Sequence, residues 1–269
     1  MRILLSLISF PFFSRVWGHI AKIKHPKFLA KKMIRFYQKH YNINMDEYIG
    51  NLEDYTSLFD FFIRYLNPKT RPLIPNNNAI VSPADGTLIS IEKIYEDKAT
   101  QVKGKLYSIT ELVKEKVDFS KGWFVATIYL SPSDYHRFHY PLSGDLKAYC
   151  HSTGSLFPVN SKGMNLVNKL FIRNERIISK FEKQGLPFYM VSVGATNVGS
   201  IKMEFISKLK RDNKWKQVKK SVKQLDEMGR FEMGSTIILL CPNELVEPPK
   251  KTNIQKILVG ESIFSLKSF

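Results

Sequence analysis

Three separated parts of the chain carry side chains that together could activate a hydroxyl group. Asp85 supplies a carboxylate between small residues, His136 and His139 supply two imidazoles three positions apart, and Ser235 supplies a hydroxyl directly after Gly234. A serine hydroxyl becomes an effective nucleophile when a histidine takes its proton, and a carboxylate can fix the tautomer of that histidine. The residue types therefore point to nucleophilic chemistry at Ser235.

Each candidate also has an ordinary structural explanation. Asp85-Gly86 between apolar runs is a hairpin-turn signal. Two histidines three apart, His136 and His139, could lie on one helical face as metal ligands, but no third ligand is apparent and no metal is predicted. Gly-Ser-Thr before a strand is typical of a bulge or a turn. No single motif decides between structure and chemistry.

Ser235 stands at the start of a predicted strand. Ile237–Leu240 form a continuous apolar run closed by Cys241-Pro242, which is typical of a strand covered on both faces. Gly234 has no Cβ, so another group can approach its backbone closely. The hydroxyl that follows could act on the carbonyl of this glycine.

Five motifs, taken together and in this order, resemble the phosphatidylserine decarboxylase family, whose members are pyruvoyl-dependent enzymes made as proenzymes. They span most of the chain from about residue 50 onward: Ser82–Gly86, His136–His139 with Pro141 and Gly144, Leu156–Asn160, Val193–Ile201, and Gly229–Ile237. Met233 stands where the family more often has Leu or Phe. It remains apolar and unbranched, so no loss of function is expected.

The resemblance implies a role for each candidate residue. Asp85, His139 and Ser235 would form the triad that cuts the chain between Gly234 and Ser235. His136 would serve the later decarboxylation step as a proton donor or substrate contact. The proposed order of events is self-cleavage first and decarboxylation second.

The resemblance also implies a cofactor and a substrate. Decarboxylation of an amino acid leaves a carbanion that needs an electron sink, and no ordinary side chain provides one. Ser235 would become a pyruvoyl group that forms a Schiff base with phosphatidylserine, giving phosphatidylethanolamine. The products 1–234 and 235–269 would stay associated as a heterodimer, and a higher oligomer is left open.

A fourth stretch has two interpretations. Leu156-Phe157-Pro158-Val159-Asn160 has an apolar body and a polar end. It matches a family motif, so Phe157, Pro158, Val159 and Asn160 are candidate substrate-binding residues. A Pro-containing loop packed on the core explains the same residues equally well.

The charge balance favours an anionic partner. The chain has 269 residues, 43% hydrophobic, and 41 Lys+Arg against 24 Asp+Glu give a net charge of +17. Residues 1–45 hold nine basic residues and no acidic one, interleaved with Leu, Ile, Phe and Trp. Such a segment is typical of an interfacial membrane helix, and nucleic acid is not predicted as a partner. The alternative is a helical face packed on the domain.

The N-terminal apolar run is too short to span a bilayer. Ile3–Phe13 falls short of the ~18 to 20 residues that spanning requires, and no small-x-small cleavage site follows it. We therefore expect a peripheral protein on the cytoplasmic face of the cell membrane. Cys150 and Cys241 lack a metal-ligand spacing, and a disulfide between them is left open.

The predicted fold is α+β, with a helical, basic, membrane-associating region in 1–68 and a mainly β catalytic domain in 69–269. The Pro-rich break at 67–72 sets this boundary. Strands are expected at Gly86–Ile94, Gly122–Leu130, Leu146–His151, Phe188–Gly194, Gly199–Ile206 and Thr236–Leu240. Helices are expected within Pro26–Leu66 and at Ile109–Lys116, Asn165–Phe171 and Asn174–Lys183, and Lys202–Lys223 is expected to form a solvated hairpin edge.

Two other functions fit parts of the sequence. A serine hydrolase could use Asp85, His139 and Ser235 on external substrates, but the chain has no Gly-x-Ser-x-Gly elbow and the serine heads an apolar strand. A non-catalytic basic module could bind an anionic membrane or nucleic acid. Of the three functions, only the decarboxylase predicts two bands on a denaturing gel.

Overall fold

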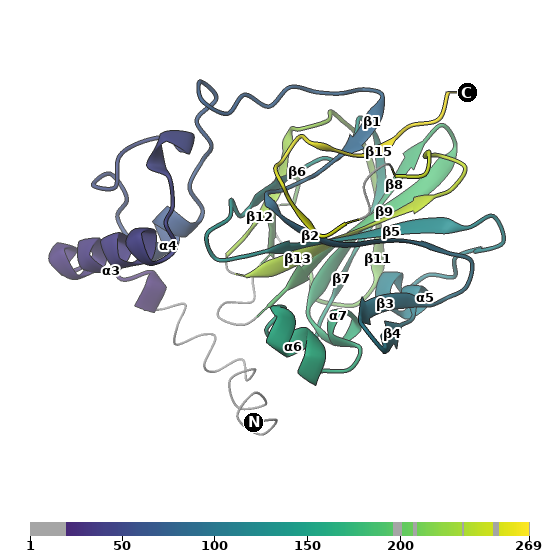
Figure 1. Cartoon of the computed structure of the whole chain (residues 1–269), viewed down its shortest axis with the longest axis horizontal. Helices are drawn as coiled ribbons and strands as arrows, with labels where there is room; N and C mark the ends of the chain where they lie inside the picture. Colours follow the sequence, from purple (N-terminus) through teal and green to yellow (C-terminus); the bar gives the residue numbers. More distant parts are fainter. Residues whose placement is uncertain (1–19, 196–200, 207–208, 233, 250–252, 269) are drawn as a thin grey trace.

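The computed structural model describes residues 20–195, 201–206, 209–232, 234–249 and 253–268. Short helices and many strands alternate along this part of the chain (Figure 1). Their bounds are α3 (Lys27–His40), η1 (Met45–Glu47), α4 (Leu58–Phe62), β1 (Ala79–Val81), β2 (Gly86–Ile94), β3 (Ala99–Val102), β4 (Lys105–Tyr107), α5 (Ile109–Val113), β5 (Trp123–Leu130), β6 (Arg137–His139), β7 (Gly144–Ser152), α6 (Ser161–Leu166), α7 (Leu170–Arg173), β8 (Arg176–Lys183), β9 (Leu186–Gly194), β10 (Ile201–Met203), β11 (Trp215–Val222), β12 (Glu227–Phe231), β13 (Ser235–Pro242), β14 (Gln255–Ile257) and β15 (Ser262–Ser265).

An eight-stranded antiparallel sheet forms the frame of the molecule, in the order β11-β7-β8-β9-β13-β5-β2-β14. The strand that begins at Ser235, β13, lies between β9 and β5 and pairs with both. All eight of its residues are buried, as the continuous apolar run predicts. Each fully buried Ile or Leu contributes ~1.5 to 3 kcal/mol, so β13 is strongly held in the sheet.

Apolar layers cover both faces of this sheet. One core cluster joins it to a second sheet of order β10-β12-β6, through residues such as Ile237, Phe138 and Phe231. The other core cluster lies under α5, α6 and α7 and includes Ile238 and Leu240 of β13 together with the helices' apolar side chains. Because successive residues of β13 face opposite sides, the strand contributes to both cores.

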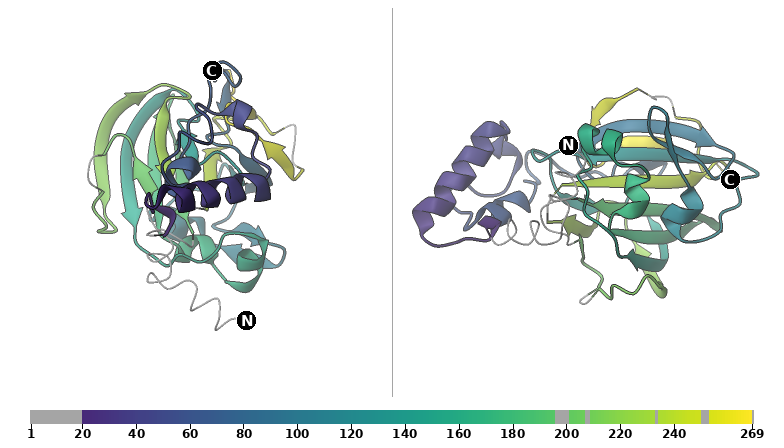
Figure 2. Two further views of the ribbon diagram at one scale, coloured as in Figure 1. Left: turned by 90° about the vertical axis from the view of Figure 1, so that its left-hand side faces the viewer. Right: turned by 90° about the horizontal axis from the view of Figure 1, so that it is seen from below.

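The helical region lies to one side of the β sheets (Figures 1 and 2). Its core cluster includes Ile34 of α3 and Phe61 of α4, and it extends into the β part through Tyr135, Leu225 and Val259. The predicted α+β class is confirmed. No helix among the described residues is long and apolar enough to cross a bilayer, and the apolar run Ile3–Phe13 lies outside them.

Most predicted strands are confirmed, but one predicted helix is wrong. Residues Arg176–Lys183 form strand β8 instead of a helix. Ile177 faces one core cluster and Ile178 the other, which is the period of a strand covered on both faces. Arg176, the first residue of this strand, is buried and donates to the carbonyls of Leu112 and Glu111.

Three further predictions are refined by the structure. The predicted strand Gly199–Ile206 is formed only at Ile201–Met203 among the described residues, and helix α3 ends at His40, well before Leu66. Within Lys202–Lys223, the basic strand β11 is an edge strand of the large sheet, as expected, but β10 belongs to the other sheet.

Candidate active site

Ser235 lies at the first position of β13, opposite Leu130 of β5 and Gly194 of β9. Its side chain is fully buried, and its Oγ has no hydrogen-bond partner within the described part of the chain. A buried hydroxyl without a partner is costly. A Cβ built on the preceding Gly234 would meet no atom of the described residues within 4 Å.

Asp85 lies at the same end of the sheet as Ser235. Thr87 of β2 and Thr236 of β13 both pair with Tyr129 of β5, which places the two strands about 10 Å apart. The Asp85 carboxylate accepts two hydrogen bonds from the Arg71 guanidinium, at 2.7 and 2.9 Å, and one from the backbone N–H of Val259. The carboxylate is thus buried and oriented by three hydrogen bonds.

His139 is buried on β6 and both of its ring nitrogens have partners. Nδ1–H donates to the carbonyl of Leu225 at 2.7 Å, so the neutral ring presents Nε2 as the acceptor for the hydroxyl of Tyr135 at 3.0 Å. Burial lowers the pKa of His139, while the Leu225 hydrogen bond and the negative charge of Asp85 oppose that shift. The backbone N–H of His139 donates to Pro83 O, which joins the His and Asp motifs.

His136 has a different environment. Its Nδ1–H donates to the carbonyl of Asp134, so Nε2 is the unprotonated nitrogen of the neutral ring, and Nε2 has no partner among the described residues. The ring lies 4.0 Å from that of Phe62. The His136 carbonyl accepts from the N–H of Phe231, four residues before Ser235. His136 therefore combines an Nε2 atom that has no described partner with a backbone contact to the segment that leads into β13.

The structure gathers the candidate residues at one end of the sheet without joining them directly. No hydrogen bond links Asp85, His139 and Ser235 to one another among the described contacts. His139 ends strand β6 and His136 directly precedes that strand, so they do not share a helix, and the alternative of a shared helical face for a metal is wrong. Within the described residues no cluster suited to hold a metal ion is present.

The Leu156–Asn160 stretch lies beside Ser235's partner Gly194. Asn174 holds it there, because its side-chain amide donates to the carbonyls of Phe157 and Gly194 and accepts from the N–H of Phe157. Phe157 and Val159 pack in the core cluster under the helices, Pro158 is half-buried, and Asn160 caps α6 by accepting from the N–H of Gly163. The side chain nearest Gly194 is that of Leu156. Substrate binding by this stretch remains a prediction.

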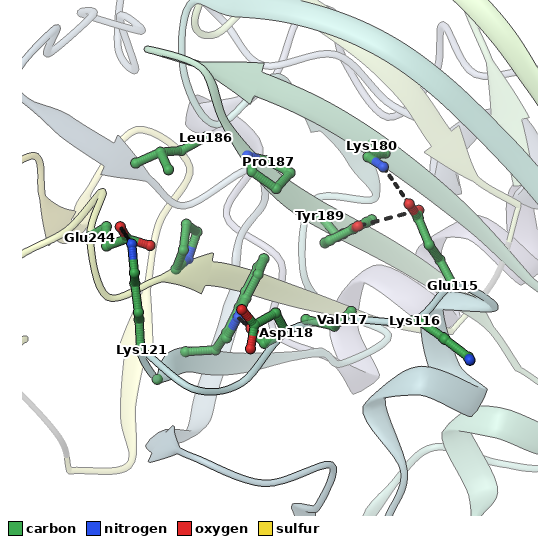
Figure 3. Close-up of a pocket in the computed structure, with 13 residues that line it drawn as sticks. Glu115, Lys116, Val117, Asp118, Lys121, Lys180, Leu186, Pro187, Tyr189 and Glu244 are labelled. Atoms are coloured by element: carbon green, nitrogen blue, oxygen red, sulfur yellow. Dashed lines mark hydrogen bonds and ion pairs between the residues drawn. The ribbon is translucent and has the colours of Figure 1, made fainter.

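The hollow shown in Figure 3 lies at the other end of the sheet. It has a volume of about 260 Å³ and its lining includes Trp123 and Pro242, which pair at the far end of β5 and β13. Lys180 and Tyr189 both bind Glu115 there (Figure 3). Eight residues of strand separate this hollow from Ser235, about 24 Å, so it is separate from the candidate site.

The sequence did not indicate several partners of the site. Arg71 lies in the Pro-rich break, where the sequence pattern indicates only a boundary, and the need of a buried carboxylate for a cation becomes visible only in the fold. Tyr135 and Asp134 lie next to the histidines but carry no motif of their own. Leu225 contributes only a backbone carbonyl, for which the sequence gives no signal.

The buried histidine makes stability depend on pH. Burial lowers the pKa of His136 to about 4 from 6.5. The folded state therefore favours the neutral ring, and its contribution, about 3 kcal/mol, is present above pH 6.5 and lost as the pH falls to 4. The thermal unfolding midpoint should drop across this window. The drop should be smaller in His136→Asn, which keeps the donor to Asp134, and an equal drop in both proteins would contradict this.

Comparison with known proteins identifies relatives over nearly the whole chain. The family model described as phosphatidylserine decarboxylase matches residues 58–265. Proteins named phosphatidylserine decarboxylase proenzyme are similar to this chain: that of Brevibacillus brevis is 36% identical over 89% of each chain, and that of Helicobacter pylori is 36% identical over 93% of this chain and 95% of its own. The protein of Saccharophagus degradans is 37% identical over 95% of this chain and 93% of its own.

Proposed function

The chain belongs to the phosphatidylserine decarboxylase family and decarboxylates phosphatidylserine after self-processing of a proenzyme, and we propose that Ser235 is the residue at which it processes itself. The observation that carries this proposal is the fully buried Oγ of Ser235, which has no hydrogen-bond partner among the residues that the structure describes. The family resemblance had led to the same bond from the motif alone.

Self-cleavage would begin with attack of Ser235 Oγ on the carbonyl carbon of Gly234. The Oγ–C bond forms, the C–N bond of the peptide breaks, and the proton of the hydroxyl passes through His139 to the released amine. An ester then links residues 1–234 to Ser235. Asp85 supports the positive charge that His139 carries during the transfer, and its field already acts on that ring.

The ester is then lost by elimination. The Cα proton of residue 235 is removed and the Cβ–Oγ bond breaks, so Gly234 leaves as a carboxylate and residue 235 becomes dehydroalanine. Addition of water and loss of ammonia convert this end into a carbonyl. The resulting pyruvoyl group supplies the electron sink for decarboxylation, and the site fits it because β13 fixes residue 235 between two strands.

His136 would supply the proton that the reaction consumes. Loss of carbon dioxide leaves a carbon that must be reprotonated, and a positioned general acid contributes roughly 10²- to 10⁴-fold. Nε2 of His136 carries no partner in the described part of the protein and lies in an apolar environment against Phe62. Because the neutral ring holds no proton at Nε2, this nitrogen would first take up a proton from water and then transfer it to the substrate carbon, with no hydrogen bond at Nε2 to break.

A denaturing gel and the mass of the small fragment test this proposal. Purified protein should give two bands, for residues 1–234 and 235–269. The smaller fragment should be lighter by one ammonia than a fragment that begins with an unmodified serine. A single band of full length would contradict the proposal, and so would a small fragment that still begins with an intact serine.

We also propose that the helical region 1–68 holds the catalytic part, 69–269, at the cytoplasmic face of the membrane. On α3, Phe28 and Phe36 are 73% and 70% exposed, and the hollow between them is lined by basic residues, Lys31, Lys32, Arg35 and Lys39. Exposed aromatic rings among cations fit an anionic lipid surface. The helix lies on the outside of the molecule, away from the sheets (Figure 2).

Replacing Phe28 and Phe36 together with serine should weaken binding to vesicles that contain anionic lipid. The loss should be roughly 10²-fold, because each ring contributes ~1.5 kcal/mol or more when it leaves water. Both rings are exposed, so folding should not change. Co-sedimentation with the vesicles measures the effect.

The matched control is Leu106→Ser, which removes an exposed apolar side chain from the β3–β4 hairpin far from α3. It should bind vesicles as the unmodified protein does. Raising salt should weaken binding of the unmodified protein only in part, since salt screens the cations and not the rings. Equal vesicle binding by the Phe28/Phe36 variant and the control would contradict the proposal that α3 contacts the membrane.

A further inference from the structure

Glu175 and His151 face the same side of the large sheet as Ser235. Ser235 pairs with Gly194, and the N–H of Gly194 donates to the carbonyl of Glu175, the residue directly before the next strand, β8. His151 follows on β7, opposite Ile177. Paired residues of an antiparallel sheet point to the same face, and two strand spacings put Glu175 about 10 Å from Ser235.

These residues form a charged cluster that the proposed reaction does not use. Oε1 of Glu175 accepts from Nε2–H of His151 at 2.7 Å and lies 3.3 Å from Nη2 of Arg211. His151 and Glu175 are 2% and 7% exposed, whereas the Arg211 side chain is 55% exposed. A buried carboxylate thus connects a buried imidazole to a guanidinium that reaches solvent.

The loop that carries Arg211 is fixed to the end of β7. Asn213 donates from its backbone N–H to the His151 carbonyl, accepts from the N–H of Thr153, and donates from its side chain to the Thr153 hydroxyl. With Glu175 holding the guanidinium from the sheet, the position of Arg211 is set from two sides.

Two observations indicate that this cluster is built for a ligand. Nδ1 of His151 is buried and has no hydrogen-bond partner among the described residues. Gly194 lies between Glu175 and Ser235 and has no side chain. A Cβ placed there would lie 3.4 Å from the Glu175 carbonyl oxygen and 3.7 and 3.9 Å from the side chains of Leu156 and Ile201, all ordinary contacts, so the row from Ser235 to the cluster is not blocked by a side chain of residue 194.

We propose that Arg211, oriented by Glu175, binds the phosphate diester of the phosphatidylserine headgroup. This rests on the proposed role of residue 235. A substrate whose amino group is joined to the carbonyl carbon of residue 235 carries its phosphorus about 6 Å from that carbon, by ordinary bond lengths. The Arg211 guanidinium, which Glu175 holds two strands away from Ser235, covers the remaining distance.

Phosphate suits Arg211 better than the substrate carboxylate does. The planar guanidinium matches two phosphate oxygens, and the phosphate keeps its charge through the whole reaction. The carboxylate must lose its charge as carbon dioxide leaves, so a strong ion pair to it would stabilise the ground state and slow the step. His151 and Glu175 are positioning residues in this scheme.

The test uses mature enzyme and two substrates: short-chain phosphatidylserine, and an O-acyl serine in which a neutral ester replaces the phosphodiester. Arg211→Gln should raise KM for phosphatidylserine roughly 10- to 100-fold, the range for a charged hydrogen bond, with little change in kcat. It should leave kcat/KM for the O-acyl serine unchanged. Glu175→Gln should shift the same KM in the same direction by a smaller factor.

The matched control is Lys210→Gln, which removes the same charge from the neighbouring exposed residue of the loop. Equal losses in the two variants, or equal losses on both substrates, would overturn the proposal.

A binding experiment tests the phosphate contact without turnover. Calorimetry compares the affinity of the enzyme for glycerophosphoethanolamine with its affinity for ethanolamine, which lacks the phosphate. Weaker binding of glycerophosphoethanolamine by Arg211→Gln would support the phosphate site, and unchanged binding would contradict it. A wild-type chain that stays uncleaved would instead contradict the role of Ser235.

Discussion

Replacing Ser235 with alanine should give a full-length, inactive protein. The hydroxyl is both the nucleophile that breaks the Gly234–Ser235 bond and the source of the carbonyl that decarboxylation needs, so both steps fail together. The side chain is fully buried at the start of β13 and has no partner among the described contacts, so its loss leaves no other group unsatisfied. A denaturing gel and an assay of carbon dioxide release measure the two outcomes.

Thr236→Val is the matched control. Thr236 is the next residue of β13, is equally buried, and also carries a hydroxyl without a partner in the described structure. Its side chain points to the opposite face of the sheet, with Tyr129 and Val193. Thr236→Val should fold and cleave as the unmodified chain does. Cleavage of the Ser235→Ala protein at the same bond would end the proposed scheme.

The second large effect separates the two histidines. His139→Asn should block or greatly slow self-cleavage, as should Asp85→Asn, because residues of such a triad act as a unit. His136→Asn keeps the donor to Asp134 and should still cleave at least in part. Carbon dioxide release from its cleaved fraction should fall by roughly 10²-fold or more, the contribution of a general acid.

The decisive measurement is activity divided by the amount of cleaved protein. If His136→Asn stays uncleaved while His139→Asn matures normally, the roles are exchanged. The triad would then read Asp85, His136 and Ser235. Nε2 of His136 has no partner among the described residues, whereas Nε2 of His139 is bonded to the Tyr135 hydroxyl. Because the two rings differ in this way, the two variants give the most informative comparison at the site.

The sequence predicted strands correctly where burial on both faces produces a continuous run of apolar residues. The apolar runs of β5 and β13 predict strands covered on both faces, and both strands are central in the sheet. The pattern failed at β8, because Arg176 is buried through hydrogen bonds to backbone carbonyls. A sequence shows that a residue is charged but not that a distant loop satisfies the charge.

The site was predictable as a set of residues but not as a set of contacts. The motifs predicted Asp85, the two histidines and Ser235, and the structure brings them to one end of the sheet. The contacts that orient them come from distant positions: Arg71 and Val259 hold Asp85, and Leu225 holds His139. Neither a backbone carbonyl nor a cation in a Pro-rich connection carries a recognisable motif.

The place of β13 in the strand order sets the earliest moment at which the chain can cut itself. The strands on either side of it, β9 and β5, have no shared partner until residues 235–242 have been synthesised. A growing chain folds from its N-terminus, so the two halves of the large sheet can join only after β13 has been made. Under the proposed scheme, the bond before Ser235 therefore reaches its folded surroundings only when β13 has entered the sheet between β9 and β5.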